Sequence, residues 1–264
     1  MRPKYAPGMA AEESSEPTLP GHAAEPADPH DDEDYSQPIL SGEGESDYER
    51  YLRTDALLAL QKTPEEQVHR DELLFQTVHQ SSELWLKHAC AEVAGATEHV
   101  REGRYDAAER LLRRAQLAAG FVHDQLEMLE QMSPWEYQTI RKVLGHGSGF
   151  DSPGFRDVRR VSPSLGDAFH QLRRDAGLSI VELYRRGREF EDLYQLAELL
   201  TEWDERVGVW RFRHYKVVAR IIGDEVVGTQ GTPVEVLGRL IHKNMYPELW
   251  SARNRLTALA KEED

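Results

Sequence analysis

The stretch DELLFQTVHQSSELWLKHACAEVAGATEHV, residues 71–100, decides the fold class of this chain. Its apolar residues recur at spacings of three and four, which is the period of an α-helix, and they form broad apolar faces rather than the alternation that indicates a strand. Gly103 follows as a stop signal. We therefore predict one long helix from Asp71 to about Val100.

The sequence that follows continues the helical pattern. Residues 105–132 are expected to form an antiparallel return helix. Ser133 and Pro134 make a cap and first-turn pair, which opens a third helix through Leu144. That helix runs into GHGSGFDSPG, residues 145–154, the most irregular piece of the body.

Proline and glycine interrupt the pattern further along the chain. Over residues 159–189 we expect short helical pieces, because Pro163 and three glycines break the pattern. These glycines are Gly166, Gly177 and Gly187. A long helix should then run from about Phe190 to Ile222 and end at Gly223.

The C-terminal part returns to helices after one loop. A flexible stretch, DEVVGTQGTP at residues 224–233, leads into a helix from Val234, and residues 246–248 start the last helix. No internal repeat is visible, so a helical solenoid is not expected. Together these patterns predict an all-α fold, a helical bundle formed by a single domain over residues 46–264.

Residues 1–45 differ from the rest of the chain in composition. They hold eleven Asp and Glu residues against only Arg2 and Lys4, and they are rich in proline. Such a segment cannot bury enough apolar surface to offset its ordering entropy, so we predict a disordered acidic N-terminal tail. A solubilising role and a recruitment role both stay open for it.

Charge and composition argue against several classes of protein. The net charge of -15 at pH 7 argues against a nucleic-acid partner, because binding a phosphate backbone needs a basic surface. No stretch approaches the roughly 18 consecutive apolar residues of a membrane span, and the N-terminus lacks a secretory pattern. A cytoplasmic protein without a membrane partner is expected. The single cysteine, Cys90, cannot form an internal disulfide.

His214 is a candidate ligand for iron. It lies in WRFRHYKVVARII, residues 210–222, where apolar residues offer a wall and basic residues could pair with carboxylates. These basic residues are Arg211, Arg213, Lys216 and Arg220. A neutral imidazole is a common protein ligand for iron, but an amphipathic helix with a basic solvated face explains this segment equally well.

Two pairs of residues spaced by four place an aromatic ring and a polar group on one helical face. They are Phe75 with His79 and Tyr137 with Arg141. Arg141 suits a bidentate grip on a carboxylate, since its planar fork matches carboxylate geometry. Taken singly, each pair also fits ordinary packing on an exposed face.

Several segments resemble, in order along the chain, the tryptophan 2,3-dioxygenase family. DELLFQTVHQSSELWLKH resembles the family helix that carries Phe and His four residues apart, and WRFRHYKVVARIIG resembles its heme-ligand helix. The other matching segments are SDYERYLRTDALLALQ, similar to an N-terminal Tyr-x-x-Tyr-Leu segment, SPWEYQTIRKVLGHGSGFDSPGFR, similar to an arginine-containing helix and Ser-Gly-Phe loop, and YPELWSARNRL, similar to a C-terminal helix. Together they cover most of the chain from Tyr48 to Leu256.

The resemblance implies that heme b lies between the helices of the bundle. His214 would be the proximal ligand of the heme iron, and His79 would act on the distal side by accepting a hydrogen bond from the indole N–H. Phe75 would pack against the indole ring. Tyr137 and Arg141 would bind the carboxylate of the substrate.

The resemblance also assigns loop residues. Ser148 and Gly149 would close over the heme edge near bound oxygen, as part of the catalytic site, and Thr229 would meet the substrate ammonium.

The N-terminal segment is implied to act between subunits. Tyr48, Tyr51 and Leu52 resemble residues that complete the substrate pocket of a neighbouring subunit. The family arrangement is an intertwined homo-oligomer, usually a tetramer.

The implied reaction is oxygenation of the indole C2=C3 bond of L-tryptophan or a substituted tryptophan by molecular oxygen, giving a product of the N-formylkynurenine type. The family's ammonium loop reads GTQGTPV here, so Gln230 replaces a glycine and Pro233 is introduced. Residues 160–190 are also shorter than in typical members. Two alternatives stay open: a heme monooxygenase of secondary metabolism that forms an oxindole from a tryptophan derivative, and a helical heme-binding protein without catalysis.

Overall fold

The computed structural model describes residues 37–263, and the chain divides after Leu58 into two compact units. In the first unit, residues 37–58 hold two short helices, α1 (Asp47–Leu52) and α2 (Thr54–Leu58). Helix α1 begins with a reciprocal cap, because the Ser46 hydroxyl accepts from the backbone N–H of Glu49 while the Glu49 carboxylate accepts from the N–H of Ser46. A disordered tail is predicted for residues 1–45. Residues 1–36 of that segment lie outside the described residues, so the disordered tail stays a prediction.

The second unit, from residue 59 onward, is built of helices and their connections. Its α-helices are α3 (Asp71–Arg101), α4 (Tyr105–Asp124), α5 (Leu126–Leu129), α6 (Pro134–Val143), α7 (Pro153–Asp175), α8 (Ile180–Arg185), α9 (Glu191–Ile222), α10 (Glu235–Leu240) and α11 (Pro247–Glu263). Residues 37–263 contain no strand, so the all-α prediction is confirmed. None of the described helices is long and apolar enough to cross a membrane.

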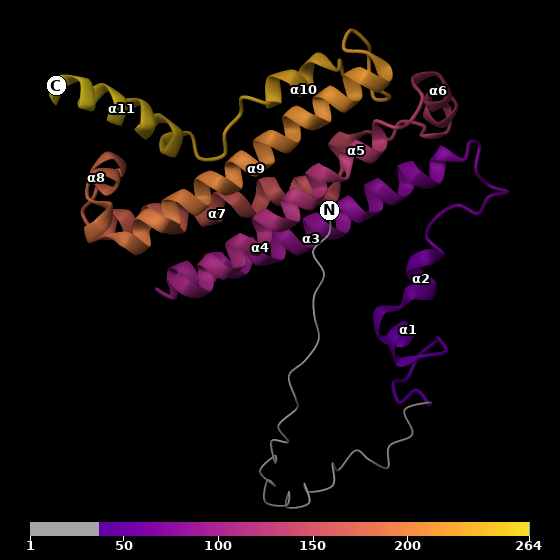
Figure 1. Cartoon of the computed structure of the whole chain (residues 1–264), viewed down its shortest axis with the longest axis horizontal. Coiled ribbons are helices and arrows are strands. Elements are labelled where there is room, and N and C mark those ends of the chain that lie inside the picture. Colours follow the sequence, from indigo (N-terminus) through magenta and orange to yellow (C-terminus); the bar gives the residue numbers. More distant parts are fainter. Residues whose placement is uncertain (1–36, 264) are drawn as a thin grey trace, which may run out of the picture. The chain divides into compact units, whose positions relative to one another are not determined.

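Four long helices, α3, α4, α7 and α9, form the body of this unit (Figure 1). Helix α3 packs along both α4 and α7, and α4 packs along α9. The apolar core between them contains the fully buried rings of Phe169 and Trp203. Gly103 ends α3 as the sequence predicts, with a φ of 72° that favours glycine at this tight turn.

A smaller apolar cluster joins α3, α5, α6 and α9. Its buried members are Val78, Leu126, Leu129, Met132, Ile140, Val217 and Ile221. Phe75 and Tyr137 pack against this cluster. The same apolar contacts therefore fix the helices that carry the residues singled out from the sequence.

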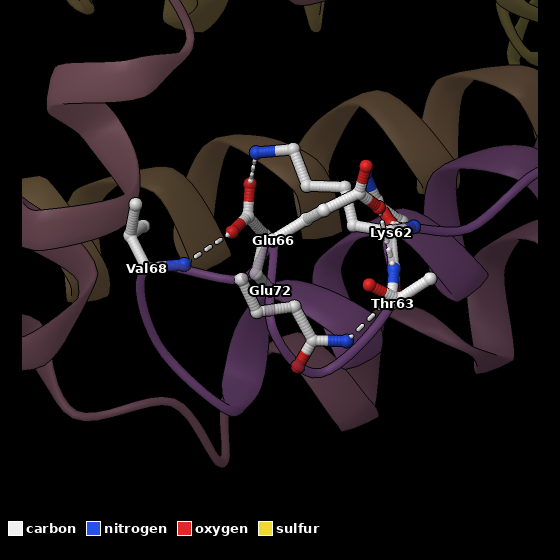
Figure 2. Close-up of polar contacts among 7 residues, drawn as sticks. Lys62, Thr63, Glu66, Val68 and Glu72 are labelled. Atoms are coloured by element: carbon white, nitrogen blue, oxygen red, sulfur yellow. Dashed lines mark hydrogen bonds and ion pairs between the residues drawn. The ribbon is translucent and has the colours of Figure 1, made fainter.

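The segment before α3 is tied to that helix by polar contacts (Figure 2). The carboxylate of Glu72, which is 3% exposed, accepts from the ammonium of Lys62 and from the backbone N–H of Val68 at 2.9 Å. Although burial acts to raise the pKa of Glu72, these bonds hold it below its usual value. One turn further along α3, Gln76 accepts from the backbone N–H of Lys62 at 3.0 Å. Residues 62–68 are thus fixed to the helix that carries Phe75.

Helix α7 corrects the first part of the prediction for residues 159–189, whereas the breaks at Gly177 and Gly187 are confirmed, because α7 ends at Asp175 and α8 ends at Arg185. Short pieces broken at Pro163 and Gly166 are predicted, but one continuous helix passes through both positions. Pro163 has no backbone N–H, so the carbonyl oxygen of Arg159 lacks its hydrogen-bond donor within the helix. Arg159 is exposed, so the loss of this hydrogen bond costs little. Gly166 lies against Tyr246, where a Cβ atom would come within 2.9 Å of Cε1 of the ring. Glycine at this position therefore permits close packing and does not end the helix.

Candidate active site

A cavity of about 510 Å³ lies between α3, α6, α7 and α9, and two loops, residues 147–153 and 228–234, border it. Its volume falls in the range of about 300–1,000 Å³ that small-molecule and cofactor sites occupy. Eight of the positions singled out from the sequence line it. They are Phe75, His79, Tyr137, Arg141, Ser148, Gly149, His214 and Thr229.

Helix α3 contributes an aromatic ring and an imidazole. Phe75 and His79 lie one turn apart, with ring centroids separated by 4.1 Å. Nδ1 of His79 lies 2.7 Å from the carbonyl oxygen of Phe75, and a carbonyl only accepts, so Nδ1 carries the proton. The other nitrogen, Nε2, is then an acceptor. The protein around the ring desolvates it and lowers its pKa, against opposing effects of the Phe75 carbonyl and of the Glu83 carboxylate, which keeps His79 neutral at pH 7.

Helix α6 contributes a phenol and a guanidinium. The Tyr137 ring lies 6.0 Å from that of Phe75, and burial raises the pKa of its hydroxyl, which stays protonated. Arg141 donates from Nη2 to the carbonyl of Val227 at 2.6 Å. Four further N–H donors are available on a guanidinium, so this bond leaves capacity for a carboxylate.

Helix α9 presents His214 to the cavity. Burial lowers the pKa of His214 from 6.5 to about 4, and the nearby His79 adds to this effect, so the imidazole is neutral at pH 7. Trp210, one turn earlier, lies parallel to the imidazole with centroids 5.0 Å apart, and Phe155 stacks on Trp210 at 3.6 Å. Within residues 37–263 the ring nitrogens of His214 make no hydrogen bond.

The two loops are joined to each other at the edge of the cavity. The hydroxyl of Thr229 donates to the carbonyl of Gly147, and the amide of Gln230 donates to the Asp151 carboxylate at 2.5 Å. Ser148 caps the short 3-10 turn at Gly149–Asp151, because its hydroxyl accepts from the N–H of Phe150.

Gly149 brings the first of these loops close to the imidazole of His214. A Cβ atom on Gly149 would lie 3.9 Å from Cε1 and 4.0 Å from Nε2 of His214. The backbone of the loop therefore approaches the ring without any side chain between them.

The residues that line this cavity do not include three of the predicted site residues. Tyr48, Tyr51 and Leu52 belong to the unit of residues 37–58, and their side chains are 68%, 78% and 46% exposed. Exposed tyrosines at these positions are compatible with a role in another copy of the chain. That role stays a prediction.

Several cavity residues were not singled out from the sequence as site residues. They are Glu83, Phe155, Arg159 and Trp210, with Arg211 noted only as part of a basic cluster. Of that cluster, Arg211 lines the cavity, whereas Arg213 pairs with Glu130. The sequence could have pointed to two of these cavity residues by spacing. Glu83 lies four residues after His79, and Trp210 lies four residues before His214, so each shares a helical face with a candidate histidine.

The residues fit a cofactor that combines a metal ion with an apolar ring and carboxylates. A neutral imidazole without a protein partner can ligate iron, and the apolar and aromatic walls can cover a flat ring. Arg159 and Arg211, on two different helices, supply positive charge at the same cavity for carboxylates. The donor set of this cavity is therefore compatible with heme.

The fold and the cavity define an all-helical protein that turns two neutral imidazoles, from α3 and α9, toward one largely apolar pocket. The sequence model described as tryptophan 2,3-dioxygenase matches residues 33–168. The chain belongs to the tryptophan 2,3-dioxygenase family, which is a family of oxidoreductases.

Individual relatives match over nearly their whole length, and each carries the name tryptophan 2,3-dioxygenase. The protein of Bacillus thuringiensis subsp. konkukian is 30% identical over an alignment that covers 79% of this chain and 92% of the relative. That of Myxococcus xanthus is 31% identical and covers 81% and 91%, and that of Caulobacter vibrioides is 33% identical and covers 79% and 98%.

Proposed function

We propose that this chain is a heme-dependent oxygenase that opens the indole ring of L-tryptophan, or of a substituted tryptophan, to a product of the N-formylkynurenine type. The observation that carries the proposal is the pair of neutral imidazoles, His79 and His214, that helices α3 and α9 turn toward one cavity. The names of the relatives supply the substrate class.

His214 is the residue that would hold the heme iron. Its pKa of about 4 means that no proton has to be displaced before it acts as a ligand at pH 7. Arg159 and Arg211 are placed to pair with the heme carboxylates. The chemistry that bound heme supplies is the activation of dioxygen for attack on the indole C2=C3 bond.

The other residues of the cavity would bind and orient the substrate. Nε2 of His79 is an acceptor and matches the indole N–H, and the Phe75 ring beside it can pack against the indole. Arg141, with its unused donors, and the protonated hydroxyl of Tyr137 would hold the substrate carboxylate. This arrangement fixes the tilt of the indole and holds its C2=C3 bond in place, which is the main task of a protein that orients a substrate.

The two joined loops would close the site. Thr229 keeps acceptor capacity on its hydroxyl for the substrate ammonium while it donates to Gly147. Ser148 and Gly149 would cover the edge of the cofactor and exclude water, because they line the cavity beside His214.

We also propose that the site is completed by a second copy of the chain. The exposed Tyr48, Tyr51 and Leu52 would enter the pocket of a neighbouring subunit in a homo-oligomer, with a tetramer as the proposed state.

The test is to reduce the purified heme protein without air, add L-tryptophan, admit oxygen-18 gas and analyse the product by mass spectrometry. Two labelled atoms in a ring-opened product, formed without continued supply of reductant, support the proposal. Failure of the protein to bind heme at all, or absence of any oxygenated product, contradicts it.

One structural observation favours a second candidate, a monooxygenase that forms an oxindole. In the loop that departs from the family pattern, Gln230 is bonded to Asp151, and Pro233 forms a bridge with Val227. These contacts hold a loop in which the family has mostly glycine, so substrate geometry can differ. One labelled atom in a product with an intact ring, with two electrons of reductant consumed per turnover, would select this candidate.

A further inference from the structure

Glu83 is a carboxylate in the wall of the cavity that takes no part in the binding roles proposed above. It lies on α3 four residues after His79, so the two side chains share a helical face. In the described part of the chain, its hydrogen-bond partners are a hydroxyl and a backbone N–H at the start of α7.

Both carboxylate oxygens are used in this contact. The hydroxyl of Ser152 donates to Oε1 at 2.5 Å, and the backbone N–H of Gly154 donates to Oε2 at 2.8 Å. Ser152 is the N-cap of α7, and its hydroxyl accepts from the N–H of Phe155 at the same time. A carboxylate at the N-terminus of a helix of 23 residues is further favoured by the helix dipole.

Helices α3 and α7 touch at this point. A Cβ atom on Gly154 would lie 2.6 Å from Cβ of Leu86 and 2.8 Å from Oε2 of Glu83. Only glycine leaves room for this approach. The start of α7 therefore cannot leave α3 without breaking both bonds to Glu83.

The loop that carries Ser148 and Gly149 runs directly into this contact, between the end of α6 at Val143 and the cap at Ser152. The backbone of Gly149 approaches the imidazole of His214 without any side chain between them. Because Ser152 follows Gly149 after only two intervening residues, the contact with Glu83 restricts where the backbone of Gly149 can lie.

We propose that Glu83 is a positioning residue whose carboxylate latches the start of α7 to α3 and thereby sets the distance between the Gly149 backbone and the His214 imidazole. The latch is a property of the folded chain. Its effect on catalysis rests on the proposed function, because only a reaction at His214 makes that distance matter.

The test is amide hydrogen–deuterium exchange, read by mass spectrometry over peptides that cover residues 145–156, in the purified protein. Glu83→Ala removes both acceptors and should speed exchange there roughly ten-fold or more, since hydrogen bonds to charged groups are lost. Glu83→Gln can accept from Gly154 and donate to Ser152, so it should restore most of the protection.

The matched control is Val161→Ala. Val161 is a buried residue of the same helix that does not line the cavity, so the substitution removes core packing away from the site. It should lower the melting temperature and leave exchange over residues 145–156 unchanged. Equal exchange in Glu83→Ala and the parent, or an equal rise in Val161→Ala, would overturn the latch. If Glu83→Ala does not fold, Glu83→Asp, which is too short to reach both partners, is read in the same way.

In the heme-loaded enzyme, Glu83→Ala should lower kcat more than it raises KM, because Tyr137 and Arg141 are untouched. If this split is absent while the exchange result holds, the latch does not act in catalysis. Failure of the oxygen-labelling test would instead remove the proposed function and leave the exchange result standing.

Discussion

Among residues 37–263, His214 is a neutral imidazole without a hydrogen-bond partner, and its substitution is the direct test of the proposed heme site. Loss of a residue that only hydrogen-bonds a metal ligand typically weakens metal binding by roughly 10- to 100-fold. His214→Ala removes the proposed ligand itself, so we expect it to weaken hemin binding by more than that. The measurement is a titration of the purified protein with hemin, followed by its visible absorbance. His88→Ala, an exposed histidine on α3, is the control. Unchanged affinity in His214→Ala would contradict the ligand assignment.

Arg141 tests the grip on the substrate carboxylate. Removal of a charged partner from a bound carboxylate costs about 1.5–3 kcal/mol, so Arg141→Ala should raise KM for tryptophan by roughly 10- to 150-fold. Arg141→Lys should recover little of this, because an ammonium cannot form the two parallel bonds of the guanidinium fork. Steady-state kinetics measure both, with the exposed neighbour Lys142→Ala as the control. A KM that stays the same in Arg141→Ala would rule out the proposed contact.

At this scale the four-residue spacing drew attention to some of the residues that line the cavity and not to others. Phe75 with His79 and Tyr137 with Arg141 were singled out because four residues make about one turn of a helix, and all four line the cavity, while their roles stay predictions. Glu83 was missed, although it also lies one turn from His79, because its meaning depends on Ser152, 69 positions away. No periodicity reports contacts between distant segments.

At the scale of elements, Gly166 tests the packing of α7. Alanine there would place Cβ 2.9 Å from the Tyr246 ring, so Gly166→Ala should lower the free energy of unfolding by about 1–3 kcal/mol despite the better helix propensity of alanine. Gly208 in α9 meets no atom within 4 Å, so Gly208→Ala should raise the free energy of unfolding by about 0.5–1 kcal/mol. Urea unfolding measures both. Equal effects of the two substitutions would show that the close contact is not the reason for glycine.

The long helices were predicted well, and Gly103, Gly177, Gly187 and Gly223 follow helix ends as predicted, whereas Pro163 and Gly166 do not break α7. Helix α9 runs over Glu191–Ile222, close to the predicted 190–222. The predicted return helix over residues 105–132 is divided at Gln125 into α4 and α5. Gly166 was interpreted as a break, but the Tyr246 ring occupies the space that a side chain at position 166 would need. The sequence does not show this contact, because Tyr246 lies 80 positions later.

At the scale of the whole molecule, the two cavity histidines should make the heme-free protein sensitive to acid. In the unfolded chain a histidine titrates near 6.5, whereas in the folded chain the pKa of His214 is about 4 and that of His79 is also lowered. Between those values the unfolded chain binds more protons, so stability present above pH 6.5 is lost as the pH falls towards 4.

The measurement is the melting temperature of the heme-free protein between pH 4 and 7. The double variant His79→Gln/His214→Gln should show a weaker dependence on pH than the parent. A double variant of two histidines that do not line the cavity, His88→Gln/His123→Gln, is the control and should keep the dependence of the parent. Identical curves for the two double variants would count against neutral histidines in the cavity.

Assembly is the part of the molecule that one chain predicts least. The proposed roles of Tyr48, Tyr51 and Leu52 depend on surfaces of another copy, and no pattern within one sequence encodes the position of that copy. Size-exclusion chromatography with light scattering measures the oligomer directly.

The hydrogen bonds from Thr229 to Gly147 and from Gln230 to Asp151 should also affect how fast molecules enter and leave the cavity. Because these bonds join the two loops at the edge of the cavity, we expect substrate and product to pass there only when both bonds open. We expect opening of these loops to limit turnover, so that the turnover number falls as the friction of the solvent on the loops rises. Raising the viscosity with sucrose would slow it, even though every reacting group stays in its place.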